Sequence, residues 1–153
     1  IVHRYQCNDY PNGKSYKSVK SPEEIVNIMM DKDQFSNWLG LTVVTVSEGY
    51  CELSCTTNEK MLNGFHILHG GISYSLSDSA LAFAANSRGY KCVSVETSIS
   101  HLRPVFIDET LRIVSNEIHR GKSIGIYEID IFNSKNELIS KFKGTVSISK
   151  DMW

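Results

Sequence analysis

The sequence lacks an excess of charge of either sign and lacks a long apolar run. Its 153 residues include 16 lysines and arginines against 17 aspartates and glutamates, which gives a formal net charge of −1. Proteins that hold nucleic acids on a basic surface carry a clear positive excess, so we expect no nucleic-acid partner. No apolar run approaches the ~20 residues of a membrane-spanning helix, so we expect no membrane span.

The first 20 residues lack the apolar stretch of a secretory signal peptide. They are polar and show no helical or strand period, which predicts an N-terminal arm over residues 1–20 and a single domain over residues 21–153. The chain opens on Ile1 rather than on methionine, so we expect its natural start to be missing or processed. We expect a cytoplasmic protein; an organelle-targeting segment that has been removed is the open alternative.

Cysteine spacings suited to a metal site or a local disulfide are also lacking. The four cysteines are Cys7, Cys51, Cys55 and Cys92. On one strand, Cys51 and Cys55 would lie about 13 Å apart, at ~3.3 Å per residue, which is too far for a disulfide between them. No Cys-x-x-Cys pair and no Cys/His spacing typical of zinc is present. We therefore expect reduced cysteines, as in an intracellular protein, and no bound metal.

The most informative segment present is HGGISYSLSDSALAFAANSRG, residues 69–89. Its apolar and small residues recur at helical spacing, which predicts a helix from about residue 70 to residue 87. The only carboxylate in it is Asp78, and a carboxylate on a buried helix needs either a partner or a chemical role. Gly70 and Gly71 at the helix start supply free N–H groups and a positive dipole end, which can stabilise a developing oxyanion.

The other elements predict an α+β domain. A helix begins at Ser21-Pro22, is broken or kinked around residues 31–33 and ends by Gly40. Alternating patterns between turn signals predict strands over residues 41–47, 50–57, 92–102, 109–119, 123–133 and 137–149. One long helix after two strands and before four more fits an antiparallel sheet that curls around that helix.

On these residues the chain resembles the PaaI-type family of hotdog-fold thioesterases, which are similar to 4-hydroxybenzoyl-CoA thioesterases. The resemblance runs from about residue 37 to residue 149. The matching segments are Asn37-Trp38-Leu39-Gly40, MLNGFHILHGG, SLSDSALAFAANSRG, SISHLRP and GKSIGIYEIDIFN. The resemblance implies a hotdog fold, hydrolysis of an acyl-CoA or similar thioester, and no cofactor apart from the CoA of the substrate. One departure is His101, where relatives often carry an aromatic residue.

The resemblance also implies the catalytic residues. Asp78 matches the catalytic carboxylate, Gly70 the N–H that polarises the thioester carbonyl, and Asn63 the asparagine that places the water or the thioester. His69 matches a histidine that supports the site, and Ser94 falls where many relatives carry a hydroxyl near the carboxylate. Structural interpretations stay open beside these roles: a hydrogen-bonded acid at Asp78, a helix cap at His69, a turn residue at Asn63 and a plain strand serine at Ser94.

The spacing of Gly70 and Asp78 predicts that two chains share each site. Eight residues on one helix span about 12 Å at ~1.5 Å per residue. Reacting groups must lie within roughly 3–3.5 Å of their partners, so one thioester cannot meet both groups of one helix. Two antiparallel copies would pair Gly70 of one chain with Asp78 of the other. We expect an obligate homodimer, and the resemblance implies a dimer of dimers.

Basic residues at turns are the candidates for holding the CoA phosphates, and a glycine among them would allow close backbone approach. The predicted substrate- and CoA-binding residues are Gly71, Arg88, Arg103, Arg120, Gly121 and Lys122. Ordinary solvated surface charge is the alternative for the basic ones.

Two other functions compete with thioester hydrolysis. One is a non-catalytic acyl-CoA-binding or regulatory hotdog module, and the other is a hotdog hydratase or dehydratase that uses an Asp/His pair. For the hydrolase itself, Asp78 as a general base and Asp78 as a nucleophile that forms an anhydride are both open.

Overall fold

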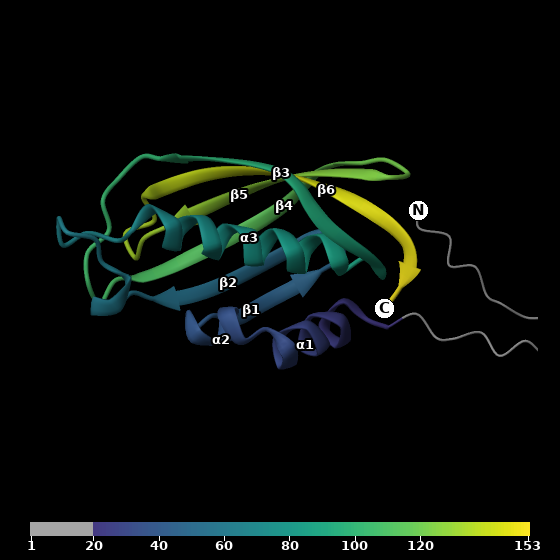
Figure 1. Ribbon diagram of the computed structural model, residues 1–153, viewed down its shortest axis with the longest axis horizontal. Helices are drawn as coiled ribbons and strands as arrows, with labels where there is room; N and C mark the ends of the chain where they lie inside the picture. Colours follow the sequence, from purple (N-terminus) through teal and green to yellow (C-terminus); the bar gives the residue numbers. More distant parts are fainter. Residues whose placement is uncertain (1–19) are drawn as a thin grey trace, which may run out of the picture.

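The computed structural model describes residues 20–153, so the predicted arm over residues 1–20 lies outside it except for Lys20. The described part opens with two short helices, α1 (Pro22–Lys32) and α2 (Gln34–Trp38). Figure 1 shows both helices alongside β1, on the side of that strand that faces away from the rest of the sheet.

The predicted start and break of the N-terminal helix are both present. Ser21 Oγ accepts a hydrogen bond from the Glu24 N–H at 3.2 Å, and the Glu24 carboxylate accepts one from the Ser21 N–H at 2.7 Å. This reciprocal capping box satisfies donors that a helix start leaves free. Asp33 ends α1 and caps α2, because its carboxylate accepts a hydrogen bond from the Ser36 N–H at 2.9 Å. The helix therefore breaks at Asp33, where the side chain binds a backbone N–H that a continuous helix would pair with a carbonyl.

Six strands form one antiparallel sheet in the order β1-β2-β4-β5-β6-β3. They are β1 (Thr42–Ser47), β2 (Tyr50–Thr56), β3 (Tyr90–His101), β4 (Thr110–Arg120), β5 (Ile124–Phe132) and β6 (Leu138–Met152). Their bounds differ from the predicted ones by three residues at most. The largest difference is at the end of β6, which continues because Met152 still pairs with Tyr90 of β3. The predicted turn between the first two strands has Gly49 at φ +75°.

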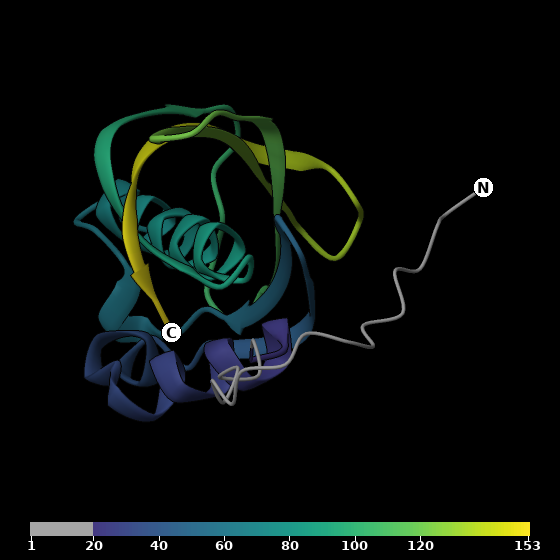
Figure 2. The same ribbon diagram turned by 90° about the vertical axis from the view of Figure 1, so that its right-hand side faces the viewer.

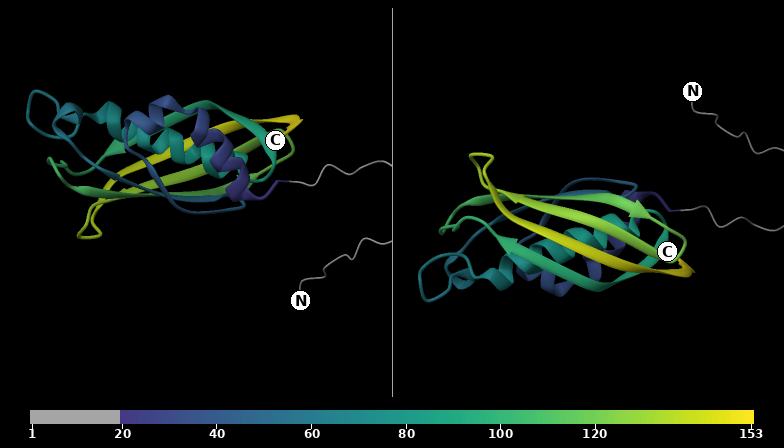
Figure 3. Two further views of the ribbon diagram at one scale, coloured as in Figure 1. Left: turned by 90° about the horizontal axis from the view of Figure 1, so that it is seen from below. Right: turned by 90° about the horizontal axis from the view of Figure 1, so that it is seen from above.

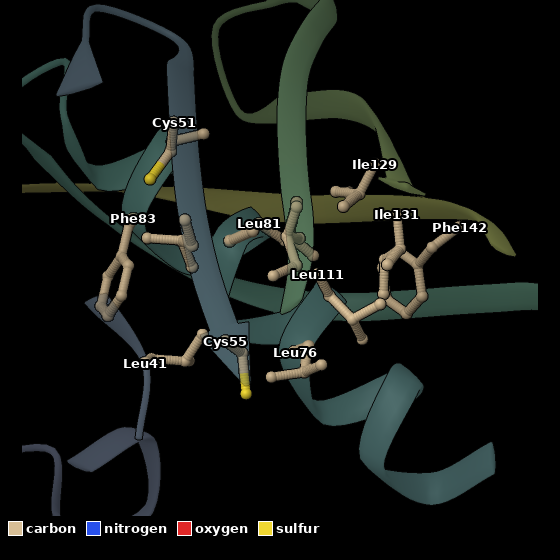
Figure 4. Packing of buried hydrophobic residues seen from close by; sticks show 14 of the residues in the cluster. Leu41, Cys51, Cys55, Leu76, Leu81, Phe83, Leu111, Ile129, Ile131 and Phe142 are labelled. Carbon is tan, nitrogen blue, oxygen red and sulfur yellow. The ribbon is translucent and has the colours of Figure 1, made fainter. Parts of the chain in front are cut away.

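The long helix α3 (Gly70–Asn86) lies in the hollow of the curved sheet, as the end-on view of Figure 2 shows. Sheet and helix approach closely, since a Cβ atom on Gly144 of β6 would overlap the Leu81 side chain of α3. Figure 4 shows Leu76, Leu81 and Phe83 of α3 packed among apolar side chains of the strands. This is the expected hotdog fold, in which an antiparallel sheet wraps one helix.

The two edges of the sheet differ in what covers them. Helix α1 packs against the edge strand β1, whereas β3 forms the other edge, outside β6, as Figure 3 shows. On β3, Val93 and Val95 are 68% and 58% exposed. An exposed, apolar edge strand has unpaired backbone groups that favour pairing with another chain.

Within residues 20–153, no helix combines the length and the apolar character needed to cross a membrane. The same residues contain no group of three or more His, Cys, Asp or Glu side chains that could hold a metal ion. The cysteines of this part, Cys51, Cys55 and Cys92, are buried and free, while Cys7 lies outside it. Burial raises the pKa of the Cys51 thiol to about 12, which keeps it protonated and unreactive at neutral pH.

Candidate active site

The loop before α3 is shaped by the side chain of Asn63. Its Oδ1 accepts hydrogen bonds from the Phe65 N–H at 2.9 Å and from the Ile67 N–H at 3.4 Å. Its own N–H donates to the Ile67 carbonyl at 2.8 Å. Asn63 is therefore a turn residue, which was one interpretation of the sequence. Of its side-chain atoms, only Oδ1 takes part in the hydrogen bonds of this turn. Within the described residues its side-chain NH₂ has no acceptor, so it remains able to hold a water or a thioester.

The start of α3 keeps one backbone donor free. His69 is the N-cap, and its Nδ1 accepts a hydrogen bond from the Gly71 N–H at 2.9 Å. The Gly70 N–H, by contrast, has no acceptor among residues 20–153. Gly70, rather than Gly71, is thus the donor that this helix end can offer to a ligand.

Gly70 and Asn63 line one cavity of about 340 Å³. His101 and Arg103, from the end of β3 and the turn after it, line the same cavity. The Arg103 guanidinium donates to the Leu138 carbonyl at 2.6 Å, so part of its hydrogen-bonding capacity is used within the protein. This one cavity thus receives hydrogen-bond donors from three segments: the start of α3, the loop before it and the end of β3.

Asp78 lies in a second cavity, of about 230 Å³, between the middle of α3 and the first half of β3. Ser94, Cys92 and apolar side chains line it with Asp78. Burial raises the pKa of the Asp78 carboxyl above its usual value, and a hydrogen bond with Ser94 partly opposes that rise. A partly buried carboxylate with one hydroxyl partner and a raised pKa has the character of a general base.

One chain therefore brings the predicted catalytic residues together in two groups. Asn63, His69 and Gly70 gather at the start of α3, and Asp78 and Ser94 gather two turns further along. The two cavities have no lining residue in common. This division agrees with the spacing argument, which requires a second copy of the chain to complete a site.

Three of the predicted CoA-binding residues meet in a third cavity, of about 460 Å³. Arg120, Gly121 and Lys122 line it together with Tyr90 and Lys150. Sequence reasoning missed Lys150, because only the pairing of β5 with β6, in which Ile124 lies opposite Ser147, brings the end of β6 near the turn after β4. A cavity with an aromatic ring and several cations is suited to a phosphorylated nucleotide.

The guanidinium groups nearby are largely occupied within the protein. Arg120 Nη1 donates to the Tyr127 hydroxyl at 3.3 Å. Arg88 binds Glu117 at 2.8 Å and Glu48 at 3.0 Å, which tethers the end of α3 to the sheet. The structure does not bring Arg88 or Arg103 to the third cavity. Lys122 and Lys150 are the cations best placed there to meet a ligand.

Comparisons with known proteins agree with this architecture. Residues 65–140 match the family model described as the thioesterase superfamily. The chain is 35% identical to acyl-coenzyme A thioesterase PaaI of Escherichia coli (strain K12), over 76% of this chain and 83% of that protein. The solved structure of the E. coli PaaI protein superimposes with a TM-score of 0.84 at 31% identity, over 86% of this chain and 95% of that one.

The fold is also shared with a structure solved with a ligand. The protein smu.793 from Streptococcus mutans UA159, bound to acetyl CoA, superimposes with a TM-score of 0.72 at 21% identity, over 74% of this chain and 91% of that one.

Proposed function

Because the chain belongs to the thioesterase superfamily and is of the PaaI type, we propose that it hydrolyses an acyl-CoA to the free acid and CoA. The observation that carries the proposal is the free Gly70 N–H at the start of α3, combined with the Asp78 carboxylate on the same helix. The first supplies a donor for a carbonyl oxygen that gains charge, and the second supplies a base for water. Relatives named acyl-CoA thioesterases support the same chemistry.

The proposed site is shared between two chains, and the edge strand β3 suggests how they meet. A two-fold axis that exchanges Gly70 and Asp78 passes near Tyr74, the midpoint between them in sequence. The Tyr74 hydroxyl lies 2.5 Å from Thr97 Oγ1, which puts this level of α3 beside the middle of β3. If β3 pairs with the partner's β3 around a two-fold axis near Thr97, the two strands run antiparallel. The two α3 helices then run antiparallel as well.

The pairing also brings the two groups of site residues together. Ser94 precedes Thr97 by three residues and His101 follows it by four. With Thr97 at the centre of an antiparallel pair, Ser94 of one chain comes close to the partner's His101. The Asp78 cavity of one protomer then adjoins the Gly70 cavity of the other. Burial of the exposed Val93 and Val95 would stabilise this arrangement. We expect such dimers to associate further into tetramers.

In the proposed mechanism, the Gly70 N–H and the dipole of its helix bind the thioester carbonyl oxygen. The partner's Asp78 takes a proton from water while the water oxygen bonds to the acyl carbon and the carbonyl electron pair moves to oxygen. The carbon–sulfur bond then breaks, and the CoA thiolate leaves and takes up a proton. Direct attack by Asp78, through an anhydride that water hydrolyses, is the open alternative. Neither route requires a metal ion or a further cofactor.

We propose that the third cavity holds the nucleotide of CoA. Lys122 and Lys150 would neutralise phosphate charge, the Tyr90 ring would stack on the base, and Gly121 would allow the backbone to approach. This cavity adjoins the Asp78 cavity along β3 and β6. Cys92 of β3 lines the Asp78 cavity and pairs with Ile148 of β6, which lines the third cavity.

A panel of acyl-CoAs with a free-thiol readout tests the function. Short, long and aryl acyl groups should include at least one substrate from which CoA is released in proportion to enzyme. Binding of acyl-CoA without thiol release would instead favour a regulatory module. Hydration of an enoyl-CoA without thiol release would favour the hydratase alternative. Either result would contradict the proposal.

Ser94→Ala should move the acid limb of the pH profile of kcat/KM to higher pH. The hydrogen bond with Ser94 lowers the pKa of Asp78, so its loss raises that pKa further. Asp78 acts as a base only when ionised, and kcat/KM should therefore begin to fall at a higher pH in the variant than in the wild type. Profiles of kcat/KM from about pH 4 to pH 8 measure this. Ser134→Ala, on the exposed turn before β6, is the control and should keep the wild-type profile. An acid limb that stays in place or moves downward in Ser94→Ala would contradict the assigned contact.

A further inference from the structure

The His101 side chain packs against the first residue of the central helix. A Cβ atom built on Gly70 would lie 3.0 Å from His101 Nε2 and 3.3 Å from its Cε1. The ring edge that carries Nε2 therefore faces Gly70, and both residues line the same cavity. Any side chain at position 70 would have to displace the ring, so His101 accounts in part for a glycine at the helix start.

Simple geometry places the two donors within reach of one oxygen atom. The backbone nitrogen and the Cβ position of a residue are about 2.5 Å apart, since each lies about 1.5 Å from the Cα. With the 3.0 Å to the imidazole, the Gly70 nitrogen and His101 Nε2 are at most about 5.5 Å apart. An oxygen about 2.9 Å from each of two donors can join nitrogens up to about 5.8 Å apart.

The direction of approach is also suitable. Along a helix the Cα–Cβ bond leans toward the N-terminus, and the N–H groups of the first turn point the same way. The His101 ring meets Gly70 on the Cβ side, so it lies at the end of the helix from which the free N–H projects. Both donors therefore face the same end of the cavity.

The His101 ring nitrogens have no hydrogen-bond partner among the described residues. The neighbouring charged and titratable groups have other roles. His69 Nδ1 is occupied by the Gly71 N–H, and the Arg103 guanidinium donates to the Leu138 carbonyl. In the proposed dimer the partner's Asp78 faces the same cavity as the base. His101 is thus a donor in this cavity that nothing else in the described chain uses.

We propose that His101 is a catalytic residue whose Nε2–H donates a second hydrogen bond to the thioester carbonyl oxygen, beside the Gly70 N–H. This inference rests on the proposed hydrolase function. The imidazole keeps its proton throughout the reaction and stabilises the oxyanion that water attack creates. Neutral imidazole with its proton on Nε2 suffices, because one N–H is all that the role requires.

The first test compares His101→Phe with His101→Gln on a substrate that the wild type hydrolyses. Phenylalanine keeps a flat ring against Gly70 and removes the donor, so kcat should fall about 10²-fold with little change in KM. Glutamine carries its amide NH₂ at a similar distance from the backbone, so kcat should stay within about tenfold of the wild type. Circular dichroism and thermal melts confirm the fold of each variant, and the Gln variant remains informative if the Phe variant does not fold.

A second measurement distinguishes a hydrogen-bond donor at position 101 from a side chain that only lines the acyl site. A CoA analogue with a ketone in place of the thioester, bound to wild-type enzyme, should show its carbonyl stretching band at lower frequency than in His101→Phe. A hydrogen bond to that oxygen weakens the C=O bond, whereas a side chain that only contacts the ligand does not. Equal band positions, or a Phe variant with wild-type kcat and an altered KM alone, would overturn the proposal. If the wild type itself releases no thiol from any acyl-CoA, the proposed function fails instead, so the two failures are distinguishable.

Discussion

Asp78→Asn is expected to lower kcat for thioester hydrolysis by about 10³-fold while the protein folds normally. The carboxylate is the base that the proposed mechanism assigns to water, and an amide cannot accept the proton. Single-turnover and steady-state assays of CoA release, with the best substrate of the panel, measure the loss. KM should change little, because the amide keeps the size and hydrogen-bonding geometry of the acid.

The expected stability of this variant follows from the sign of the pKa shift. Burial raises the pKa of Asp78 in the folded protein, so folding disfavours the ionised form at neutral pH. Removal of that charge should leave the melting temperature at neutral pH equal to, or above, that of the wild type. Asp108→Asn makes the same chemical change at an exposed turn residue and should keep wild-type activity. Hydrolysis near the wild-type rate by Asp78→Asn would contradict both proposed routes.

Gly70→Pro should reduce kcat by about 10²–10³-fold relative to Gly70→Ala. Proline removes the backbone N–H, yet it is favoured in the first turn of a helix. The preceding residue, His69, has φ −62° and ψ 132°, an extended conformation that suits a residue before proline. Alanine adds a Cβ at the same place against His101 but keeps the donor, so the comparison isolates the N–H from the steric change. Equal rates for the two variants would exclude the Gly70 N–H as the oxyanion donor.

The two inactive variants together test the shared site. In a dimer of one Asp78→Asn chain and one Gly70→Pro chain, one site has both defects and the other has none. Random mixing by co-refolding should therefore restore about a quarter of wild-type activity, since half of the dimers carry one intact site of two. Sites confined to single chains would give no recovery at all.

The sequence predicted the elements of this fold closely, and local physical chemistry explains why. The Ser21 capping box, the Asp33 break and the Gly49 turn are each decided by a few neighbouring residues, so their patterns are visible in the chain itself. The apolar and small residues of α3 have a helical period because one sheet surrounds that helix. Strand ends were less accurate, because β6 extends as far as β3 offers it a partner.

For the predicted site residues, the structure adds the surroundings that the sequence left open. Spacing along α3 was enough to separate Gly70 from Asp78, since the rise of a helix is fixed. A helix cap at His69 was one of the open interpretations, but the sequence did not decide that the His69 ring takes the Gly71 N–H and leaves that of Gly70 free. Sequence reasoning also treated Arg88 as a CoA ligand, whereas its guanidinium binds Glu117 and Glu48. Such pairings join residues far apart in the chain.

By itself, then, the sequence predicted the hotdog architecture and the family, and it led to the proposal that two copies of the helix share each site. These depend on local periods, caps and distances along one element. The tertiary structure alone decided that His101 lies against Gly70, that Lys150 joins Lys122, and that β3 is the exposed edge. Each of these depends on strand order and register, which bring residues together from 30 or so positions apart. Contacts of that kind arise from the packing of the whole sheet around its helix, and no local pattern records them.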